Sequence, residues 1–204
     1  MHISDGVLPN TICIGGYLLA MGVSAVCIKK CMEPKELPKI AVMTSVFFVA
    51  SLISVPLGPT SVHLILPGLV GVTLGAMAFP SVMLGLVLQS ILFQHGGLTA
   101  IGANTLMMGI PAIMSGLLFR QVRNSDNRSF IISTGSFCGA LGTLLAGIIL
   151  ALLLFTSGED FLGVAKVALA AHVPVIIIEA VITGVVVSFL LKVKPDLIGA
   201  RRRP

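Results

Sequence analysis

The sequence has few charged residues and no cysteine motif. Only 10% of its 204 residues are charged, whereas 56% are hydrophobic, and the mean hydropathy is +1.07. This composition excludes a soluble globular domain. The four cysteines form no C-x-x-C pair and no metal-ligand spacing. We expect them to be free thiols that pack as small apolar side chains.

Motifs for hydrolytic chemistry are also absent. The chain has no P-loop, so we do not expect it to be an enzyme that hydrolyses ATP by itself. It has no H-E-x-x-H sequence and no serine–lysine pair within an apolar run, which argues against an intramembrane hydrolase. No linker or low-complexity tract divides the sequence. Residues 1–204 are therefore predicted to form a single membrane-embedded domain.

Long apolar runs fill most of the chain. A bilayer core of about 30 Å is crossed by a helix of about 20 apolar residues, and runs of about this length are bounded here by charge, proline or glycine. We predict an all-α integral membrane protein, a bundle of about seven transmembrane helices. The third and fourth runs meet at Pro80, and the fourth is short, which favours a tilted or partly re-entrant segment. The predicted spans are residues 11–28, 40–57, 62–79, 80–94, 98–119, 130–156 and 163–191.

Basic residues are distributed unevenly between the predicted loops. Twelve of the thirteen fall between spans one and two, between spans five and six, or after span seven, and only Lys166 lies on the other side. Positive residues collect in cytoplasmic loops, so the N-terminus is predicted outside and the C-terminus in the cytoplasm. The net charge of +5 follows from this asymmetry and from contact with anionic lipid. No nucleic-acid partner is inferred from it.

Small residues recur at four-residue spacing within several spans. Such spacing lets membrane helices approach closely where no hydrophobic force drives them together. We interpret the pattern as internal packing, and the alternative is contact with a partner subunit in the membrane. The positions are Gly16, Ala20 and Ser24 in span one, Gly71 and Gly75 in span three, Ala112 and Gly116 in span five, and Gly135, Gly139, Thr143 and Gly147 in span six.

All four histidines fall in the outer half of the predicted topology. His2, His63 and His95 lie at the outer ends of their segments, and His172 lies about ten residues into the last span. This placement points to the capture of a ligand from outside. His95 is equally compatible with a solvent-exposed loop residue. Glu179, buried in the same last span, is costly in a membrane and should have a partner or a purpose.

Two amide side chains lie at membrane depth. Gln89 is in span four and Asn104 is in span five. Metal-bound histidines usually donate their second ring nitrogen to another polar group, so these amides are candidates for hydrogen bonds around a metal site. Hydrogen bonding between helices explains them equally well.

The first two residues, Met1 and His2, form a candidate metal chelate. The free α-amine, the amide nitrogen of His2 and its imidazole can grip one ion together and close a five-membered and a six-membered ring. His63 could add a fourth nitrogen, and a planar set of four nitrogens is typical of Ni(II) or Cu(II). The alternatives are a tail that frays in solvent, a His63 that faces water or lipid headgroups, and a signal peptide cleaved near residue 25. The missing positive n-region argues against the last.

The sequence resembles a known protein family. The opening M-H-I-S-D-G is similar to the M-H-I-x-[DE]-G opening of the nickel and cobalt substrate-binding components of energy-coupling factor transporters, the CbiM/NikM family. Blocks at residues 60–63, 88–104 and 172–184 agree as well. The likeness covers nearly the whole chain.

The resemblance implies a seven-helix membrane protein whose tail inserts into the bundle. The metal ligands would be the Met1 amine, the His2 amide and imidazole, and His63. His95, Asn104 and Gln89 remain the candidates, from the residues themselves, for the groups around these ligands. The ion is then a transported substrate, Ni²⁺ or Co²⁺, and not a cofactor. Nickel is favoured because affinity rises from Co²⁺ to Ni²⁺.

The resemblance also implies partners and a location. The partners would be energy-coupling-factor ATPase subunits, a transmembrane coupling component and a small accessory membrane subunit, and the location is the plasma membrane of a prokaryote. A stand-alone carrier or channel is the alternative. It would need a polar path across the membrane, yet the ionisable residues inside the spans reduce to His172 and Glu179.

Overall fold

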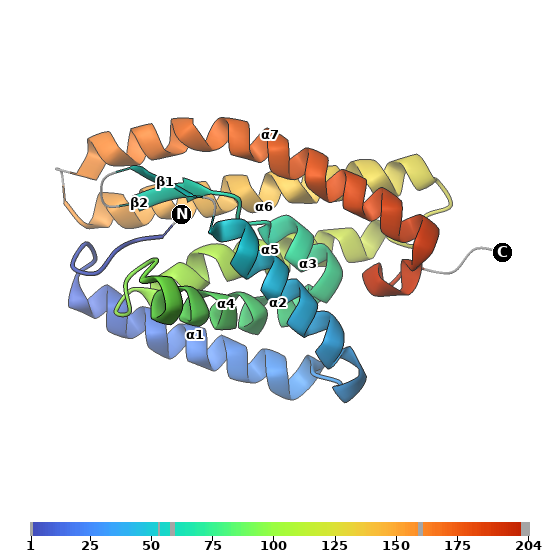
Figure 1. Ribbon diagram of the computed structural model, residues 1–204, viewed down its shortest axis with the longest axis horizontal. Coiled ribbons are helices and arrows are strands. Elements are labelled where there is room, and N and C mark those ends of the chain that lie inside the picture. The colour runs from blue at the N-terminus through green and yellow to red at the C-terminus, as the bar shows by residue number, and fades with distance from the viewer. Residues whose placement is uncertain (1, 53, 58–59, 159–160, 201–204) are drawn as a thin grey trace.

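Seven α-helices and one β-hairpin make up the part of the chain that the structure, a computed structural model, describes: residues 2–52, 54–57, 60–158 and 161–200. The helices run roughly along the long axis of the molecule (Figure 1). The elements are α1 (Asn10–Cys31), α2 (Leu37–Ser51), β1 (Ser54–Leu57), β2 (Thr60–His63), α3 (Pro67–Leu74), α4 (Ala78–Phe93), α5 (Ile101–Val122), α6 (Arg128–Thr156) and α7 (Leu162–Val193), with 3₁₀ turns η1 (Pro34–Glu36), η2 (Gly75–Met77) and η4 (Pro195–Ile198).

Five segments of the described chain are long and apolar enough to cross a membrane. The segment Pro67–Phe93, which contains α3 and α4, counts as one of them, and α2 with its 15 residues is not among the five. The prediction of a helical bundle suited to a membrane is therefore confirmed. The predicted number of about seven transmembrane helices stays a prediction.

The third predicted span, residues 62–79, is not one helix. Its first residues belong to strand β2, which pairs antiparallel with β1, and α3 covers only Pro67–Leu74. Helix α3 ends where Gly75 adopts a positive φ of 57°, and the 3₁₀ turn η2 then leads into α4. Glycine tolerates this left-handed backbone without steric cost. The chain therefore reverses at Gly75, five residues before Pro80, where the sequence predicted the boundary.

The short helix α3 lies inside the bundle. All eight of its residues are buried. A Cβ atom at Gly71 would overlap the carbonyl oxygen of Ala112 in α5, and one at Gly68 would overlap that of Cys138 in α6. Glycine at both positions lets α3 contact two neighbouring helices at backbone distance. Because α3 follows the hairpin after three residues, its close packing also limits where strand β2 can lie.

The small-residue faces of α1 and α6 also pack internally. A Cβ atom at Gly16 would lie 2.9 Å from the Ala103 nitrogen in α5, and one at Gly139 would lie 2.5 Å from the Glu179 oxygen in α7. The interpretation of these faces as internal packing is confirmed. The outward face of α7 is apolar instead, with Val173, Ile177, Val181 and Val185 each more than half exposed. Such a face suits contact with lipid.

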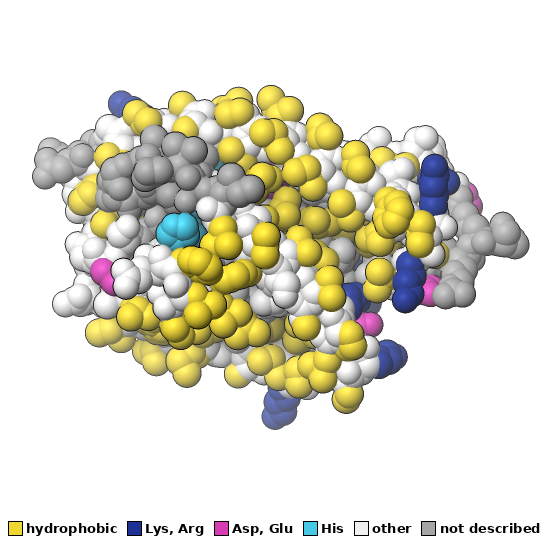
Figure 2. Space-filling model, viewed as in Figure 1, with side chains coloured by type: hydrophobic (Ala, Val, Ile, Leu, Met, Phe, Trp, Pro, Cys, Tyr) yellow, Lys and Arg dark blue, Asp and Glu magenta, His cyan; other side chains and the backbone are white. Residues whose placement is uncertain are grey.

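The two ends of the bundle carry different side chains. One end, the basic end, gathers lysines and arginines where α1, α5 and α7 finish and where α2 and α6 begin. Figure 2 shows them together, with a histidine side chain exposed toward the opposite end. This opposite end, the histidine end, holds the N-terminal segment, the hairpin β1–β2 and the loop between α4 and α5.

Candidate metal centre

The N-terminal segment is held in the bundle by its own backbone. The Ile3 side chain is fully buried. Its N–H donates to Asn104 Oδ1 at 3.0 Å, and its carbonyl accepts from Asn104 Nδ2 at 3.2 Å and from the Gly97 N–H at 3.2 Å. One amide side chain from α5 thus satisfies both backbone groups of Ile3, which are costly to bury unpaired. The alternative of a tail that frays in solvent is wrong for residues 2–9. Met1 lies outside the described residues.

Asp5 attaches the same segment to the loop that precedes α5. Its carboxylate accepts hydrogen bonds from the Leu98 N–H at 3.1 Å, from the Thr99 N–H at 2.8 Å and from the Thr99 hydroxyl. The hydroxyl of Thr99 holds the pKa of Asp5 below its ordinary value. Asp5 therefore stays ionised, and this contact is kept, down to a pH below the usual aspartate range. Gly6, with a φ of 80°, then turns the chain toward α1.

The side chains of His2 and His63 meet at the histidine end. Their rings stack with centroids 4.5 Å apart and an interplanar angle of 23°. Both residues are nearly fully buried, with 4% and 3% of their surface exposed. Burial lowers the pKa of each imidazole well below its ordinary value, so both rings are neutral at pH 7. Neutral imidazole is the form that binds a metal.

Each of these two rings has one nitrogen without a partner. His63 Nδ1 lies 3.0 Å from the Leu64 carbonyl oxygen. A carbonyl only accepts, so Nδ1 carries the proton, and the lone pair of the ring is on Nε2. His63 Nε2 and His2 Nε2 are both buried, and neither has a hydrogen-bond partner among the residues that the structure describes. Buried polar atoms are rarely left in this state, and a neutral ring nitrogen with a free lone pair is able to bind a ligand.

The other two histidines also have a buried unpaired nitrogen, namely His95 Nδ1 and His172 Nε2. The His95 ring is 6.4 Å from that of His2, between centroids. His172 is fully buried in α7, and its Nδ1 lies 2.5 Å from the Ala168 carbonyl oxygen. The His95 ring is thus farther from His2 than the His63 ring, whose centroid is 4.5 Å away. The described residues contain no group of three or more His, Cys, Asp or Glu side chains placed to hold an ion by themselves.

The two amides predicted to surround the site differ in what they contact. Asn104 binds the backbone of Ile3, next to His2, rather than an imidazole. Gln89 is fully buried in α4, and its Nε2 donates to Ser51 Oγ at the end of α2. The hydrogen bond of Gln89 therefore joins two helices, which was the alternative interpretation of this residue.

Comparison with known proteins identifies the family of this chain. A family model described as the cobalt uptake substrate-specific transmembrane region, CbiM, matches residues 2–197. The chain belongs to the CbiM family. A putative metal transport protein of Haemophilus influenzae is 35% identical, over 98% of this chain and 97% of that protein. A putative fused nickel transport protein, NikMN, of Archaeoglobus fulgidus is 30% identical, over all of this chain and 70% of that protein.

The fold of this CbiM-family protein matches a solved structure over almost its full length. A crystal structure of a transition metal transporter superposes with a TM-score of 0.83, at 28% identity, and covers 95% of this chain and 93% of that one. The family transports cobalt or nickel across membranes, and the histidine end is where this chain brings unpaired imidazole nitrogens together.

Sequence reasoning missed several residues that build the histidine end. Thr99 secures Asp5, and Thr143 of α6 contacts the buried carboxylate of Glu179. Threonine in an apolar span carries no signal of such a role, because it also hydrogen-bonds to its own helix backbone, as Thr73 does here. The partner expected for Glu179 on grounds of burial is present, and it includes the chain segment next to His63.

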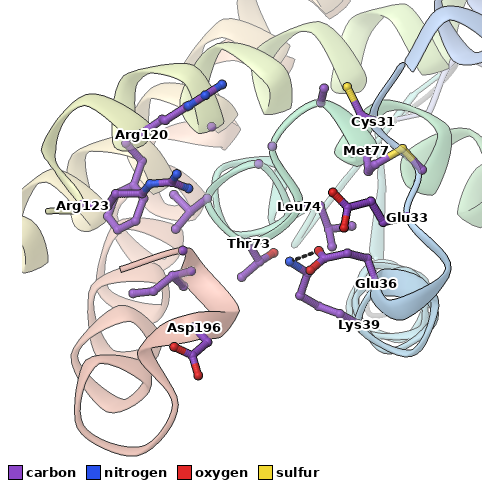
Figure 3. Close-up of a pocket in the computed structure, with 18 residues that line it drawn as sticks. Cys31, Glu33, Glu36, Lys39, Thr73, Leu74, Met77, Arg120, Arg123 and Asp196 are labelled. Carbon is purple, nitrogen blue, oxygen red and sulfur yellow. Dashed lines mark ion pairs between the residues drawn. The ribbon is translucent and has the colours of Figure 1, made fainter. Parts of the chain in front are cut away.

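A pocket of about 460 Å³ lies at the opposite, basic end of this CbiM-family protein. Figure 3 shows Arg120 and Arg123 on one side of it and Glu33, Glu36 and Lys39 on the other. Its lining includes no histidine. Glu36 pairs with Lys39, and Glu33 pairs with Lys35 at 2.7 Å. The two glutamates are thus paired with lysines, and the unpaired imidazole nitrogens lie at the other end of the molecule.

Proposed function

We propose that this chain is the substrate-binding membrane component of an ATP-driven uptake transporter for Ni²⁺, with Co²⁺ as a second substrate. The ion enters at the histidine end from outside the cell. Its ligands are the Met1 amine, the amide and imidazole nitrogens of His2, and His63. The observation that carries the proposal is the buried, stacked pair of neutral imidazoles, each with an unpaired nitrogen, one of them at residue 2.

The docking of residues 3–5 supports the role of the chain terminus. Ile3 and Asp5 are fixed by six hydrogen bonds to α5 and to the loop before it, at a site directly after His2. A chelate that uses the terminal amine needs such an ordered segment, because a mobile tail would lose its conformational entropy when it binds the ion.

The distribution of charge supports entry at the histidine end. The basic end carries all the described lysines and arginines except Lys166. By the positive-inside rule this end lies in the cytoplasm. The histidine end then faces outside, and ions released inside would leave toward the basic end. Coupling to ATP hydrolysis needs separate ATPase subunits and a coupling component, since this chain has no P-loop. The fused nickel transport relative, of which this chain spans 70%, supports partner components.

Binding of Ni²⁺ is expected to strengthen steeply with pH. The imidazoles are already neutral, because burial lowers the pKa of His2 and His63. The protons released are therefore those of the amine, which titrates near 7.7 to 8, and of the His2 amide. Affinity should rise about 100-fold per pH unit below about pH 7.7, where both protons are displaced, and about tenfold per unit above it.

Titration calorimetry of the full chain in detergent, in buffers with different ionisation enthalpies, measures both the affinity and the protons released. Two protons at pH 7 and about one at pH 8.5 agree with the proposal. A profile with a single step near pH 6.5 would show that ordinary, exposed imidazoles control binding, and the proposed ligand set would be wrong. Absence of Ni²⁺ and Co²⁺ binding would overturn the proposed function itself.

A further inference from the structure

Glu179 is a fully buried carboxylate in the interior of α7. Its Oε1 accepts hydrogen bonds from the Ile65 N–H at 2.7 Å and from the Leu66 N–H at 2.9 Å. Its Oε2 accepts from the hydroxyl of Thr143 in α6. Three donors from two different elements thus converge on one carboxylate, which is the arrangement that satisfies a buried acid.

The two backbone donors belong to the segment that follows His63. Ile65 and Leu66 connect strand β2 to α3. Leu66 has a φ of 55°, in the left-handed region that a branched side chain seldom adopts. Such a conformation persists only where the surroundings determine it. Glu179 binds the N–H groups on both sides of the Ile65–Leu66 step, so it holds the backbone in this shape.

This segment also orients the imidazole of His63. The Leu64 carbonyl accepts the hydrogen bond from His63 Nδ1 and thereby directs Nε2 away from the backbone. The peptide unit that supplies this carbonyl also supplies the Ile65 N–H, which is bound to Glu179. One rigid peptide plane therefore connects the carboxylate in α7 to the ring of His63.

The position of Glu179 is itself fixed by close helix packing. A Cβ atom at Gly139 of α6 would lie 2.5 Å from the Glu179 backbone oxygen. A Cβ atom at Gly142, one turn farther along α6, would lie 2.7 Å from the Gly68 nitrogen in α3. The three helices contact one another at backbone distance around this carboxylate, so Glu179 has little room to move.

We propose that Glu179 is a positioning residue for the metal centre, acting through the backbone of residues 64–66 on His63. The inference rests on the proposed function. The two imidazole ligands are then held by different parts of the bundle. Helix α5 and the loop before it bind the segment that contains His2, whereas the Glu179 side chain of α7, itself bound by Thr143 of α6, binds the segment that follows His63. A carboxylate that only capped α3 would bind N–H groups of its first turn, yet both of its backbone donors, Ile65 and Leu66, precede Pro67, the first residue of the helix.

The test compares Ni²⁺ affinity, measured by calorimetry, for Glu179→Ala, Glu179→Gln and the control Thr183→Val. Thr183 lies one turn along the same helix, is fully buried, and has a hydroxyl without a hydrogen-bond partner. Loss of groups that orient a metal ligand costs about 10–100-fold in affinity, which is the loss expected for Glu179→Ala. Glu179→Gln keeps an oxygen acceptor for both N–H groups and should lose less than tenfold, and Thr183→Val should bind as the unmodified protein does.

A double-mutant cycle with His63→Ala separates positioning from general destabilisation. If Glu179 acts through His63, adding Glu179→Ala to His63→Ala causes no further loss of affinity. Additive losses, or Glu179→Ala binding as tightly as the unmodified protein, would overturn the positioning role. Circular dichroism shows whether the Glu179→Ala variant is folded. If it is not, Thr143→Val takes the place of Glu179→Ala in the cycle, because it removes one of the three hydrogen-bond donors to the Glu179 carboxylate. Failure of the proposed function is distinguishable, because the unmodified protein would then bind neither Ni²⁺ nor Co²⁺. Unchanged Ni²⁺ affinity in His63→Ala alone would instead remove His63 from the ligand set.

Discussion

Replacement of His63 by alanine is expected to weaken Ni²⁺ binding by about 100-fold. Binding free energies of about 10–16 kcal/mol at four-ligand protein sites correspond to about 3 kcal/mol per ligand, and each 1.4 kcal/mol is a factor of ten in affinity. His63 is one of the two stacked, buried imidazoles. Calorimetry at pH 7.5 measures the loss, and the visible absorption band of the Ni²⁺ complex should move because one nitrogen donor is replaced by water.

His95→Ala is the matched comparison for that experiment. His95 also has a buried unpaired nitrogen, but its ring centre is 6.4 Å from that of His2, against 4.5 Å for His63. We expect a loss of less than about tenfold, at the lower limit for groups around a metal ligand. A larger loss for His95→Ala than for His63→Ala would assign the fourth ligand to His95 and contradict the proposed set.

Replacement of Gly97 by alanine is expected to abolish Ni²⁺ binding, although Gly97 is not one of the proposed ligands. A Cβ atom there would overlap the backbone nitrogen and the carboxylate of Asp5. Backbone cannot rotate away as a side chain can, so residues 2–5 would have to leave their position. The proposed chelate draws three of its four nitrogens from Met1 and His2, and it would be lost with that segment.

Gly15→Ala is the control for Gly97→Ala. Gly15 lies in α1 on the same side of the molecule, and no atom lies within 4 Å of a Cβ built there. Alanine also favours a helix over glycine by about 1 kcal/mol. Both variants should keep the helical circular dichroism spectrum, and only Gly97→Ala should lose the ion. Tight binding by a folded Gly97→Ala protein would show that the docking of residues 2–5 is not required.

The long helices could be predicted from the sequence because hydropathy alone determines them. The predicted spans 130–156 and 163–191 differ from α6 and α7 by two residues or fewer at each end. The hairpin β1–β2 was missed because it lies within a nearly continuous apolar stretch, where a strand and a helix cannot be told apart by pattern. Gly58–Pro59, between the two strands in the sequence, is a turn signal, but a hairpin inside a membrane protein is not expected from hydropathy.

The pairing of His2 with His63 could be predicted in part, and the supports around it could not. The sequence placed both residues at one end of the bundle, and their rings do meet there. That Asn104 binds the backbone of Ile3, and that Glu179 binds the segment after His63, depends on contacts between residues more than 100 positions apart. Such pairs leave no pattern in a single sequence.

The central claim is that the terminal amine is a metal ligand, and a two-residue extension tests it most directly. Adding Gly-Ser before Met1 converts the amine of Met1 into an amide and leaves every side chain unchanged. The same dipeptide added after Pro204 serves as the control. The account predicts that the N-terminal extension abolishes Ni²⁺ binding in calorimetry, together with the absorption band of planar Ni²⁺, while the C-terminal extension alters neither. Undiminished affinity in the N-terminally extended protein would contradict the chelate.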